Sequence, residues 1–535
     1  MIATLLFALA AQAKTLPVSA PIFPPMSSAM FQDTVLEVEK QLQKGEFAAA
    51  AKTADLLPKN RIGLSYDEKN LPLQDRPAFR AALAGAIQSW PTVHITTEGK
   101  ADIKLSFQPT LAADPQTGSP AHVALFFNTE SNLPREEAVV GLKRGSPLHP
   151  TTPDNFAGDV KFVIGSYIGL AKINIAGRAM NSSDDWMSER AITARDQEVA
   201  NACLNLSNRL RAAVAAKKII GVSRPASAFI DPPGFDGDAI QGDQLDLPIQ
   251  ISNRGQGMLA VVAEGDCGCV LGGQLAPVAP GESGLLKARI DTKEITGPVE
   301  RKVFVYTNDP NLPAKEIPVK LAVSPRYRFF MEGGNARTVE DGGSQFDVFF
   351  TYPDGDENKI VVSKTAVVGL EGATATFEPW SGDIGDPALN EPVKTRHGYR
   401  AKVSVPGTLP PGRSPITLAL FTDVPGFASV YYTINLQKGI VALPEELFLG
   451  ELAHTMKKST VLLSRPGKPF VVRSVRSTLR NFSAAVVPSG RPDEVKIEVT
   501  YDGKAPAGSI EGAIVVETND PKQPTVKISV VGSSS

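Results

Sequence analysis

The segment GPVERKVFVYTNDPNLPAKEIPVKLAV at residues 297–323 decides the fold of the C-terminal half, because its pattern occurs again near the end of the sequence. Residues 508–532 read GSIEGAIVVETNDPKQPTVKISVVG, with a Gly, an alternating strand, the turn Thr-Asn-Asp-Pro and a second strand in the same order. A weaker copy, GRSPITLALFTDVPGFASVYYTINL, lies at 412–436. The intervals between copies fit one sandwich of about seven antiparallel strands each. Three tandem all-β sandwiches are predicted, at 222–325, 326–437 and 438–535.

The Thr-Asn-Asp-Pro turn has a structural explanation. Asn and Asp bond to nearby backbone groups and tolerate left-handed φ values, while Pro fixes φ and ends the strand ladder. Turn chemistry accounts for both Asn308-Asp309 and Asn519-Asp520, so we favour a structural role over a binding role for these residues.

The first half of the chain has a different, mixed α and β pattern. Apolar residues recur at helical spacing, and three segments alternate like strands. A helical lead-in and an α+β domain are predicted at 30–217, after a Pro- and Ser-rich linker at 14–29. The expected helices cover about 30–44, 46–56, 75–90, 156–175 and 194–217, and the expected strands cover 93–98, 101–107 and 121–127.

Composition and targeting signals limit the partners. The chain has 535 residues, too many for one hydrophobic core, and its formal net charge of -2 lacks the basic excess that nucleic-acid binding requires. Residues 1–13 form a short apolar run ending in Ala-Gln-Ala, which is typical of a secretory signal. No stretch approaches the ~20 apolar residues of a membrane helix. We expect a secreted, periplasmic or cell-surface protein without an integral membrane segment, which binds a protein, a peptide or an envelope component.

Three cysteines are present, so disulfides are not the main support of the fold. Cys267 and Cys269 flank Gly268, and their role has several interpretations. They could form a structural bridge or remain semi-buried thiols, act as a labile redox pair, or bind a soft metal. Two thiolates fall short of the four ligands of a structural zinc site. Cys203 lies in a predicted helix and is expected in the core.

The C-terminal half resembles a family of immunoglobulin-like domains of exported bacterial proteins, related to the Hydin-type sandwiches. The matching residues are FDGDAIQGDQLDLPIQISNRGQGMLAV, CGC, VAPGESGLLKARID and TNDP in 222–325, with a looser match in 438–535. Such domains act mostly as spacers and interaction modules. The resemblance therefore implies no catalytic chemistry.

The first half resembles the matrixin group of zinc metalloproteases over about 75–215. In such enzymes a helix carries His-Glu-x-x-His-x-x-Gly-x-x-His, in which the His residues bind zinc, Glu is the base, and Gly turns the chain toward the third His. Aligned on FVIGSYIGLAK at 162–172, this motif matches only the scaffold residues Ile164-Gly165 and Gly169-Leu170. Met180 falls where the family has its methionine turn. The resemblance implies a zincin-like α+β fold for this domain.

The ligand positions of the motif do not match. Phe162 and Ser166 stand at the two helical His positions, Val163 at the Glu position and Lys172 at the third His position. Zinc needs about three converging lone-pair donors, and hydrolysis needs a general base. Phe and Val have neither, and a Lys cation repels the metal. This alignment predicts a pseudoprotease with no catalytic residue and no cofactor.

The remaining histidines raise the alternative of a different metal site. His122 matches the position of a structural-zinc ligand and is the weak metal candidate, while His94 and His149 lie in the same domain. Neither helical i, i+4 spacing nor a tight cluster brings the three together. Ser166 has no assignable base for nucleophilic catalysis.

Three functions follow. The favoured one is an exported, non-catalytic binding or structural protein with a pseudoprotease head and immunoglobulin-like spacer domains. Such a head would hold a peptide without cutting it. The first alternative function is a divergent matrixin-like zinc metallopeptidase with a non-standard metal site. The second is a cell-envelope adhesin or structural component that acts through its immunoglobulin-like sandwiches.

Overall fold

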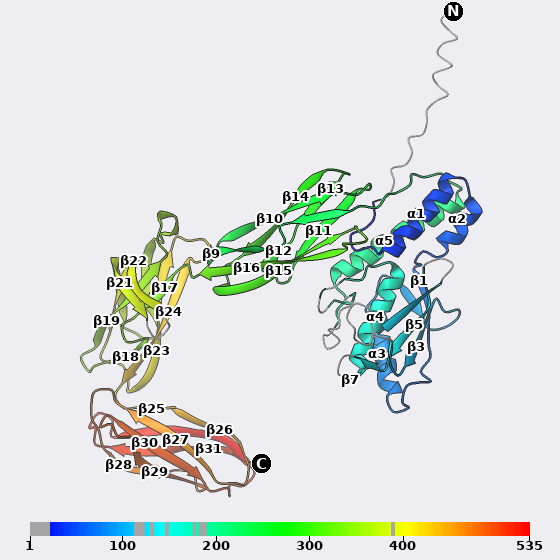
Figure 1. The fold of residues 1–535 in the computed structure, drawn as a ribbon. Helices are drawn as coiled ribbons and strands as arrows, with labels where there is room; N and C mark the ends of the chain where they lie inside the picture. The colour runs from blue at the N-terminus through cyan, green and yellow to red at the C-terminus, as the bar shows by residue number, and fades with distance from the viewer. Residues whose placement is uncertain are drawn as a thin grey trace, which may run out of the picture. The chain divides into compact units, whose positions relative to one another are not determined.

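The computed structural model describes residues 22–111, 123–128, 133–144, 149–173, 175, 178–180, 190–386 and 391–534. Contacts between Cα atoms divide the chain into two compact units, Met1–Ser324 and Pro325–Ser535. The first unit contains an α+β head and one sandwich, and the second contains two further sandwiches (Figure 1). No helix among the described residues is long and apolar enough to cross a membrane.

The head is built on a five-stranded mixed sheet with the order β2-β1-β3-β5-β4. The inner strands run parallel, and the edge strand β4 pairs antiparallel with β5. Two very short strands, β6 and β7, form a separate pair. The strands are β1 (Arg61–Tyr66), β2 (His94–Thr96), β3 (Ile103–Gln108), β4 (Val123–Asn128), β5 (Leu133–Gly141), β6 (Lys143–Arg144) and β7 (His149–Pro150).

Among the described residues, five helices accompany this sheet, and the five predicted helices are confirmed. Helices α3 and α4 lie side by side next to the sheet, whereas α1, α2 and α5 pack together. The predicted helix at 156–175 is wrong at its end, because Gly169 adopts a left-handed φ of 105° that stops α4. The helices are α1 (Ala29–Gln43), α2 (Phe47–Ala54), α3 (Arg76–Gln88), α4 (Pro153–Ile168) and α5 (Ala194–Ala215).

The prediction of β-sandwiches in the second half is also confirmed. In sandwich 1, the sheet β12-β14-β10-β8 faces the sheet β13-β11-β15-β16-β9 around a core of alternating apolar residues. Its strands are β8 (Ala228–Asp231), β9 (Phe235–Ile240), β10 (Gln244–Asn253), β11 (Leu259–Gly265), β12 (Val270–Leu271), β13 (Gln274–Val278), β14 (Ser283–Asp291), β15 (Gly297–Thr307) and β16 (Ala314–Ser324).

Sandwich 2 pairs the sheet β17-β19-β22-β21 with the sheet β18-β24-β23-β20. Its β21 and β22 are the longest strands of the unit. The strands are β17 (Arg328–Phe330), β18 (Ala336–Thr338), β19 (Ser344–Tyr352), β20 (Val362–Val368), β21 (Thr374–Asp386), β22 (Glu391–Val405), β23 (Gly412–Thr422) and β24 (Ser429–Lys438), with one 3-10 turn at Asp356–Asn358.

Sandwich 3 pairs the sheet β25-β27-β30-β29 with the sheet β26-β32-β31-β28. It has a hydrophobic core of its own. The strands are β25 (Val441–Leu443), β26 (Glu446–Leu452), β27 (Lys457–Ser464), β28 (Val472–Ser477), β29 (Phe482–Pro488), β30 (Glu494–Tyr501), β31 (Gly508–Thr518) and β32 (Thr525–Ser534).

The sequence repeat corresponds to one corner that recurs in all three sandwiches. Thr307 Oγ1 donates to the carbonyl of Leu312, and the equivalent bonds from Thr422 and Thr518 are 2.6 and 2.7 Å long. Each hydroxyl also accepts the backbone N–H two residues later. The following Asn or Asp bonds to the backbone N–H of a neighbouring segment at 2.8–2.9 Å. The corner therefore ties two strands and a neighbouring segment together, as the turn interpretation requires.

Candidate functional site

Helix α4 carries the positions that the matrixin alignment singled out. Thr152 caps the helix, and its side chain accepts the N–H of Asn155 in a capping box. Phe162 and Val163 are buried at 7% and 3% exposure, whereas Ser166 is half-buried. Lys172 lies beyond the helix and is exposed. The helix thus directs the side chains of Phe162 and Val163, which are both hydrocarbon, into the core of the head.

The glycines of α4 leave room for close packing. A Cβ added to Gly165 would overlap Met180 Sδ and lie 3.1 Å from the Trp90 ring. A Cβ added to Gly169 would lie 2.8 Å from the ring of Phe31, in addition to its strained φ of 105°. Met180 and Trp90 are fully buried. Packing alone therefore requires both glycines, and the space beside them holds a thioether and aromatic rings.

The residues at this place do not fit a zinc ion. Imidazole, carboxylate or thiolate donors are needed, and neither a phenyl ring nor an isopropyl group has a lone pair. The described residues also contain no cluster of three His, Cys, Asp or Glu side chains suited to a metal. His94 and His149 are exposed on β2 and β7, and His122 lies outside the described residues.

The predicted linker at 14–29 is wrong for residues 22–28, which we call the strap. Phe23 and Met26 are buried at 2% and 0% exposure. Ser27 forms an antiparallel bridge with Leu170, directly after the end of α4. The Pro- and Ser-rich composition suggested a free segment, but apolar side chains at two positions suffice to anchor it in the core.

Met26 connects the head to sandwich 1 through its backbone. Its N–H donates to Thr307 O at 2.8 Å, and its carbonyl accepts the N–H of Ala171 at 2.6 Å. Its φ of 61° is unusual for a residue other than Gly, Asn or Asp. Beside it, Gln32 Nε2 donates to Asn308 O at 2.9 Å. The Thr-Asn-Asp-Pro corner of sandwich 1 thus docks on the head through main-chain carbonyls, while the Asn308 side chain serves the turn.

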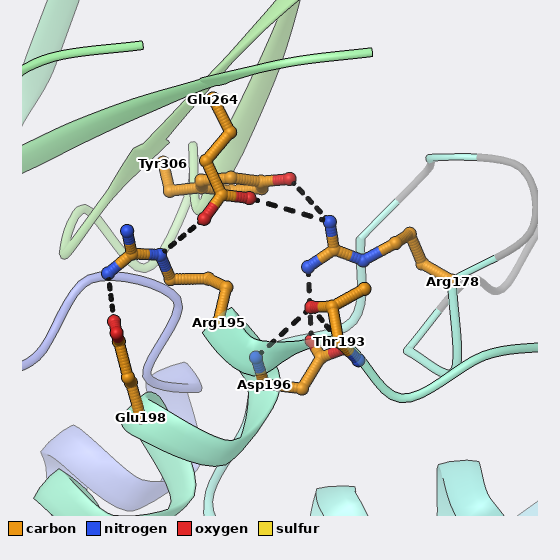
Figure 2. Close-up of polar contacts among 7 residues, drawn as sticks. All are labelled: Arg178, Thr193, Arg195, Asp196, Glu198, Glu264 and Tyr306. Carbon is orange, nitrogen blue, oxygen red and sulfur yellow. Dashed lines mark hydrogen bonds and ion pairs between the residues drawn. The ribbon is translucent and has the colours of Figure 1, made fainter. Parts of the chain in front are cut away.

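A partly buried ion-pair network lies next to this contact (Figure 2). Arg178, whose side chain is 11% exposed, donates to the Tyr306 hydroxyl at 2.9 Å and lies 3.4 Å from Asp196. Arg178 Nη1 is 3.7 Å from Glu264 on β11, and Arg195 Nε donates to the same carboxylate at 2.9 Å. Burial raises the pKa of Tyr306 to about 12, so its hydroxyl remains neutral. Asp196 also caps α5 by accepting from Thr193.

A second buried carboxylate ties α1 to the segment that enters sandwich 1. Glu39 has 0% exposure and accepts hydrogen bonds from Ser223 N at 2.7 Å and from Ser223 Oγ at 3.0 Å. Burial raises the pKa of Glu39 to about 7, although both bonds act in the opposite direction. The head core also extends into sandwich 1 through Val262 and Tyr306. Sequence patterns gave no signal for this junction, because its residues are far apart in the chain.

The cysteines occupy two environments. Cys267 and Cys269 are joined in a disulfide with Cα atoms 5.3 Å apart, so they offer no thiolate to a metal in this state. Both are half-buried against the core of sandwich 1. Cys203 lies on α5 with 0% exposure, as expected, and burial raises the pKa of its thiol.

The junction between sandwiches 2 and 3 is built differently. Gln523 makes two bonds with the linker residue Ile440, accepting its N–H at 2.6 Å and donating to its carbonyl at 2.7 Å. Around this contact, Lys468 pairs with Glu340 and Lys522 pairs with Asp341. All four of these charged side chains are 47–67% exposed. The same corner of the repeat is used, but the two ion pairs between the sandwiches are about half exposed, while Asp520 of the corner pairs with Arg465 in a largely buried contact within sandwich 3.

Comparison with known proteins gives only remote similarities. No family model matches, and no curated protein matches. Among solved structures, the chain is similar to a protein of unknown function from Porphyromonas gingivalis W83, at 14% identity over 39% of this chain and 99% of that one, with a TM-score of 0.17. Three immunoglobulin domains of titin match at 10% identity over 59% and 100% of the two chains, with a TM-score of 0.15. SGBP-B of Bacteroides ovatus, in complex with a mixed-linkage heptasaccharide, matches at 12% identity over 58% and 71%, with a TM-score of 0.15. These values assign no function.

Proposed function

We propose that this chain is an exported, non-catalytic binding or structural protein, whose zincin-like head is a pseudoprotease fixed to the first of three immunoglobulin-like sandwiches. The observation that carries the proposal is the packing of α4. Phe162 and Val163 are buried hydrocarbon at the positions where ligand and base would stand, and Met180 fills the space beside Gly165. A side chain without lone pairs provides neither zinc affinity nor general-base catalysis.

The sheet and helix order supports a zincin-like head. A mixed sheet with one antiparallel edge strand precedes α4, a left-handed Gly169 ends that helix, and the buried Met180 packs under it. These features agree with the scaffold positions of the matrixin alignment. They leave a fold that can support or hold a partner such as a peptide or an envelope component.

An export route to the periplasm or the cell surface belongs to the same proposal. The apolar run at 1–13 with its Ala-Gln-Ala end supports it, and the Cys267–Cys269 disulfide suits an oxidising compartment. Cell fractionation and N-terminal sequencing of the mature protein test this part. We expect the extracytoplasmic fraction and a first residue of Lys14; a cytoplasmic protein that keeps residues 1–13 would contradict it.

Metal analysis and peptide hydrolysis test the lack of catalysis. We expect the full chain, purified from zinc-supplemented cells, to contain well below one zinc per chain and to cleave no peptide of a mixed library. The matched variant carries Phe162→His, Val163→Glu and Ser166→His, which restores two helical imidazoles and a carboxylate. Stoichiometric zinc in the natural chain, or cleavage that a chelator abolishes, would overturn the proposal.

A further inference from the structure

The outer face of one sheet of sandwich 2 carries a regular row of cations. On β22 the side chains of Tyr399, Ala401, Val403 and Val405 are buried in the sandwich core. Side chains alternate along a strand, so the even-numbered residues face outward. These outward residues are Lys394, Arg396, Gly398, Arg400 and Lys402. Four cations thus extend over roughly 27 Å with a glycine at the centre, at about 3.4 Å per residue.

An aromatic platform, formed by Trp380 and Phe349, lies on the same face as this row. Trp380 on β21 is directly opposite Gly398 on β22, and its ring reaches Phe349 on β19, with ring centroids 4.6 Å apart. Because β22 lies between β21 and β19, the two rings meet over β22, and the indole also lies against Gly382 of its own strand. Gly398 is buried, whereas Trp380 and Phe349 are half-buried. Neither ring belongs to the hydrophobic core of sandwich 2, so this face exposes aromatic surface that the fold does not need for its interior.

Carboxylates alternate with the cations around the platform. Arg400 Nε donates to Glu378 Oε1 at 2.8 Å, and Arg400 Nη1 lies 3.8 Å from Asp347. Arg396 stacks on Phe330, with its guanidinium carbon 4.9 Å from the ring centroid. Lys394 and Lys402, at the two ends of the row, are exposed. The face offers both acceptors for hydroxyl groups and cations for carboxylates.

We propose that this face of sandwich 2 binds an acidic polysaccharide, with a sugar ring stacked on Trp380 and uronate carboxylates held by the row of cations on β22. The flat apolar face of a pyranose fits an indole that is open on one side. A polyuronate carries hydroxyl groups next to each carboxylate, so its hydroxyls can donate to Glu378 and Asp347 while its carboxylates meet the cations, whereas single-stranded DNA has no hydroxyl group between its phosphates. The charge pattern therefore favours a polyuronate over a polynucleotide.

The test uses the full chain and a defined probe, a galacturonate pentamer, titrated by calorimetry at low salt. We expect saturable binding that weakens as salt rises, because the contacts are partly ionic. Trp380→Ala is expected to weaken binding roughly tenfold, the effect of a central aromatic contact. Lys394→Ala combined with Lys402→Ala is expected to weaken it several-fold. That pair keeps the experiment informative if Trp380→Ala does not fold.

Matched controls lie on sandwich 3. Phe448→Ala removes another exposed ring, which is 74% exposed, and Lys496→Ala with Lys527→Ala removes two exposed lysines from β30 and β32. These variants should bind the pentamer like the natural chain. The proposal is overturned if the pentamer does not bind at millimolar concentration, or if the Trp380 and lysine variants bind it unchanged. Equal affinity for an uncharged glucose pentamer, or tighter binding of a single-stranded oligonucleotide, overturns it as well.

Discussion

The two described junctions of the chain use the same corner in opposite ways. At the head, the corner at Thr307 meets the strap, and the surrounding charges of Arg178 and Asp196 are buried. Between sandwiches 2 and 3, the ion pairs that cross the junction beside the corner at Thr518 are about half exposed. Buried pairs are costly to break, whereas exposed pairs contribute little and are screened by salt. The head and sandwich 1 should therefore unfold as one body, and sandwiches 2 and 3 should separate more easily.

The largest effect is expected from Tyr306→Ala. This tyrosine has 0% exposure and belongs to the core shared by the head and sandwich 1. Truncating a large buried aromatic costs about 3–5 kcal/mol, and here it also removes a partner of Arg178. Calorimetry should show that the unfolding temperatures of the head and of sandwich 1 are both lowered.

The matched control is Tyr501→Ala, at a tyrosine of 1% exposure in the core of sandwich 3. It should lower the transition of sandwich 3 and leave that of the head unchanged. If Tyr306→Ala lowers only the transition of sandwich 1, the two parts do not form one cooperative body, and the comparison fails.

The next effect is a pH dependence at the head junction. The pKa of Glu39 is raised to about 7 from a usual value of 4.5. Between these values the unfolded chain has released the proton and the folded head still holds it, so a rise in pH favours unfolding. The head should lose roughly 3 kcal/mol between pH 4.5 and 7 from this group, with no further loss above that range.

Denaturant titrations at pH 5 and pH 8 measure this loss. Glu39→Gln should remove most of the difference, because an amide does not ionise. Glu37→Gln, on an exposed side chain of the same helix, should keep it. Equal pH dependence in both variants would show that the cause lies elsewhere.

A smaller effect is expected at α4. In Gly165→Ala the new methyl group meets Met180 Sδ and the Trp90 ring, and such overpacking costs about 1–3 kcal/mol. Arg178 lies two residues before Met180 and forms a β-bridge with Ala191, so the variant should also disturb Arg178. Thermal unfolding of the full chain provides the measurement.

Gly85→Ala is the control for this change. Gly85 is exposed in the middle of α3, with nothing within 4 Å of an added Cβ. This variant should be stabilised by about 0.5–1 kcal/mol. A stabilised Gly165→Ala would show that the packing around α4 is looser than the structure indicates.

The smallest effect is expected at the exposed junction. Lys468→Ala removes the pair with Glu340 and should cost about 0.2–1 kcal/mol. The difference from the natural chain should vanish near 1 M salt, where the screening length is about 3 Å. Arg178→Met, at the buried junction, should keep its destabilisation at the same salt concentration. A salt-independent effect of Lys468→Ala would remove the contrast between the junctions.

Local patterns predicted much of the fold. Helical spacing and caps located the five helices, and the repeated Thr-Asn-Asp-Pro turn indicated the sandwiches. Strands β1 and β5 were missed, as was the strap, whose two apolar anchors lie in a segment of linker-like composition. The ion-pair network could not be predicted from the sequence, because Arg178, Asp196 and Glu264 come together only in the tertiary structure. The need for a glycine at position 165 also became clear only from the position of Met180, which sequence patterns do not predict.

The bonds of Met26 impose an order of events on the newly made chain. Its N–H bonds to Thr307, which is about 280 residues later in the sequence. At about 5–20 residues per second, a ribosome needs roughly 15 to 60 s to cover that distance. During this interval the strap lacks its hydrogen-bond partner Thr307, and the apolar residues of the head that pack against Tyr306 remain uncovered. A nascent head should therefore need a holding chaperone until sandwich 1 has emerged.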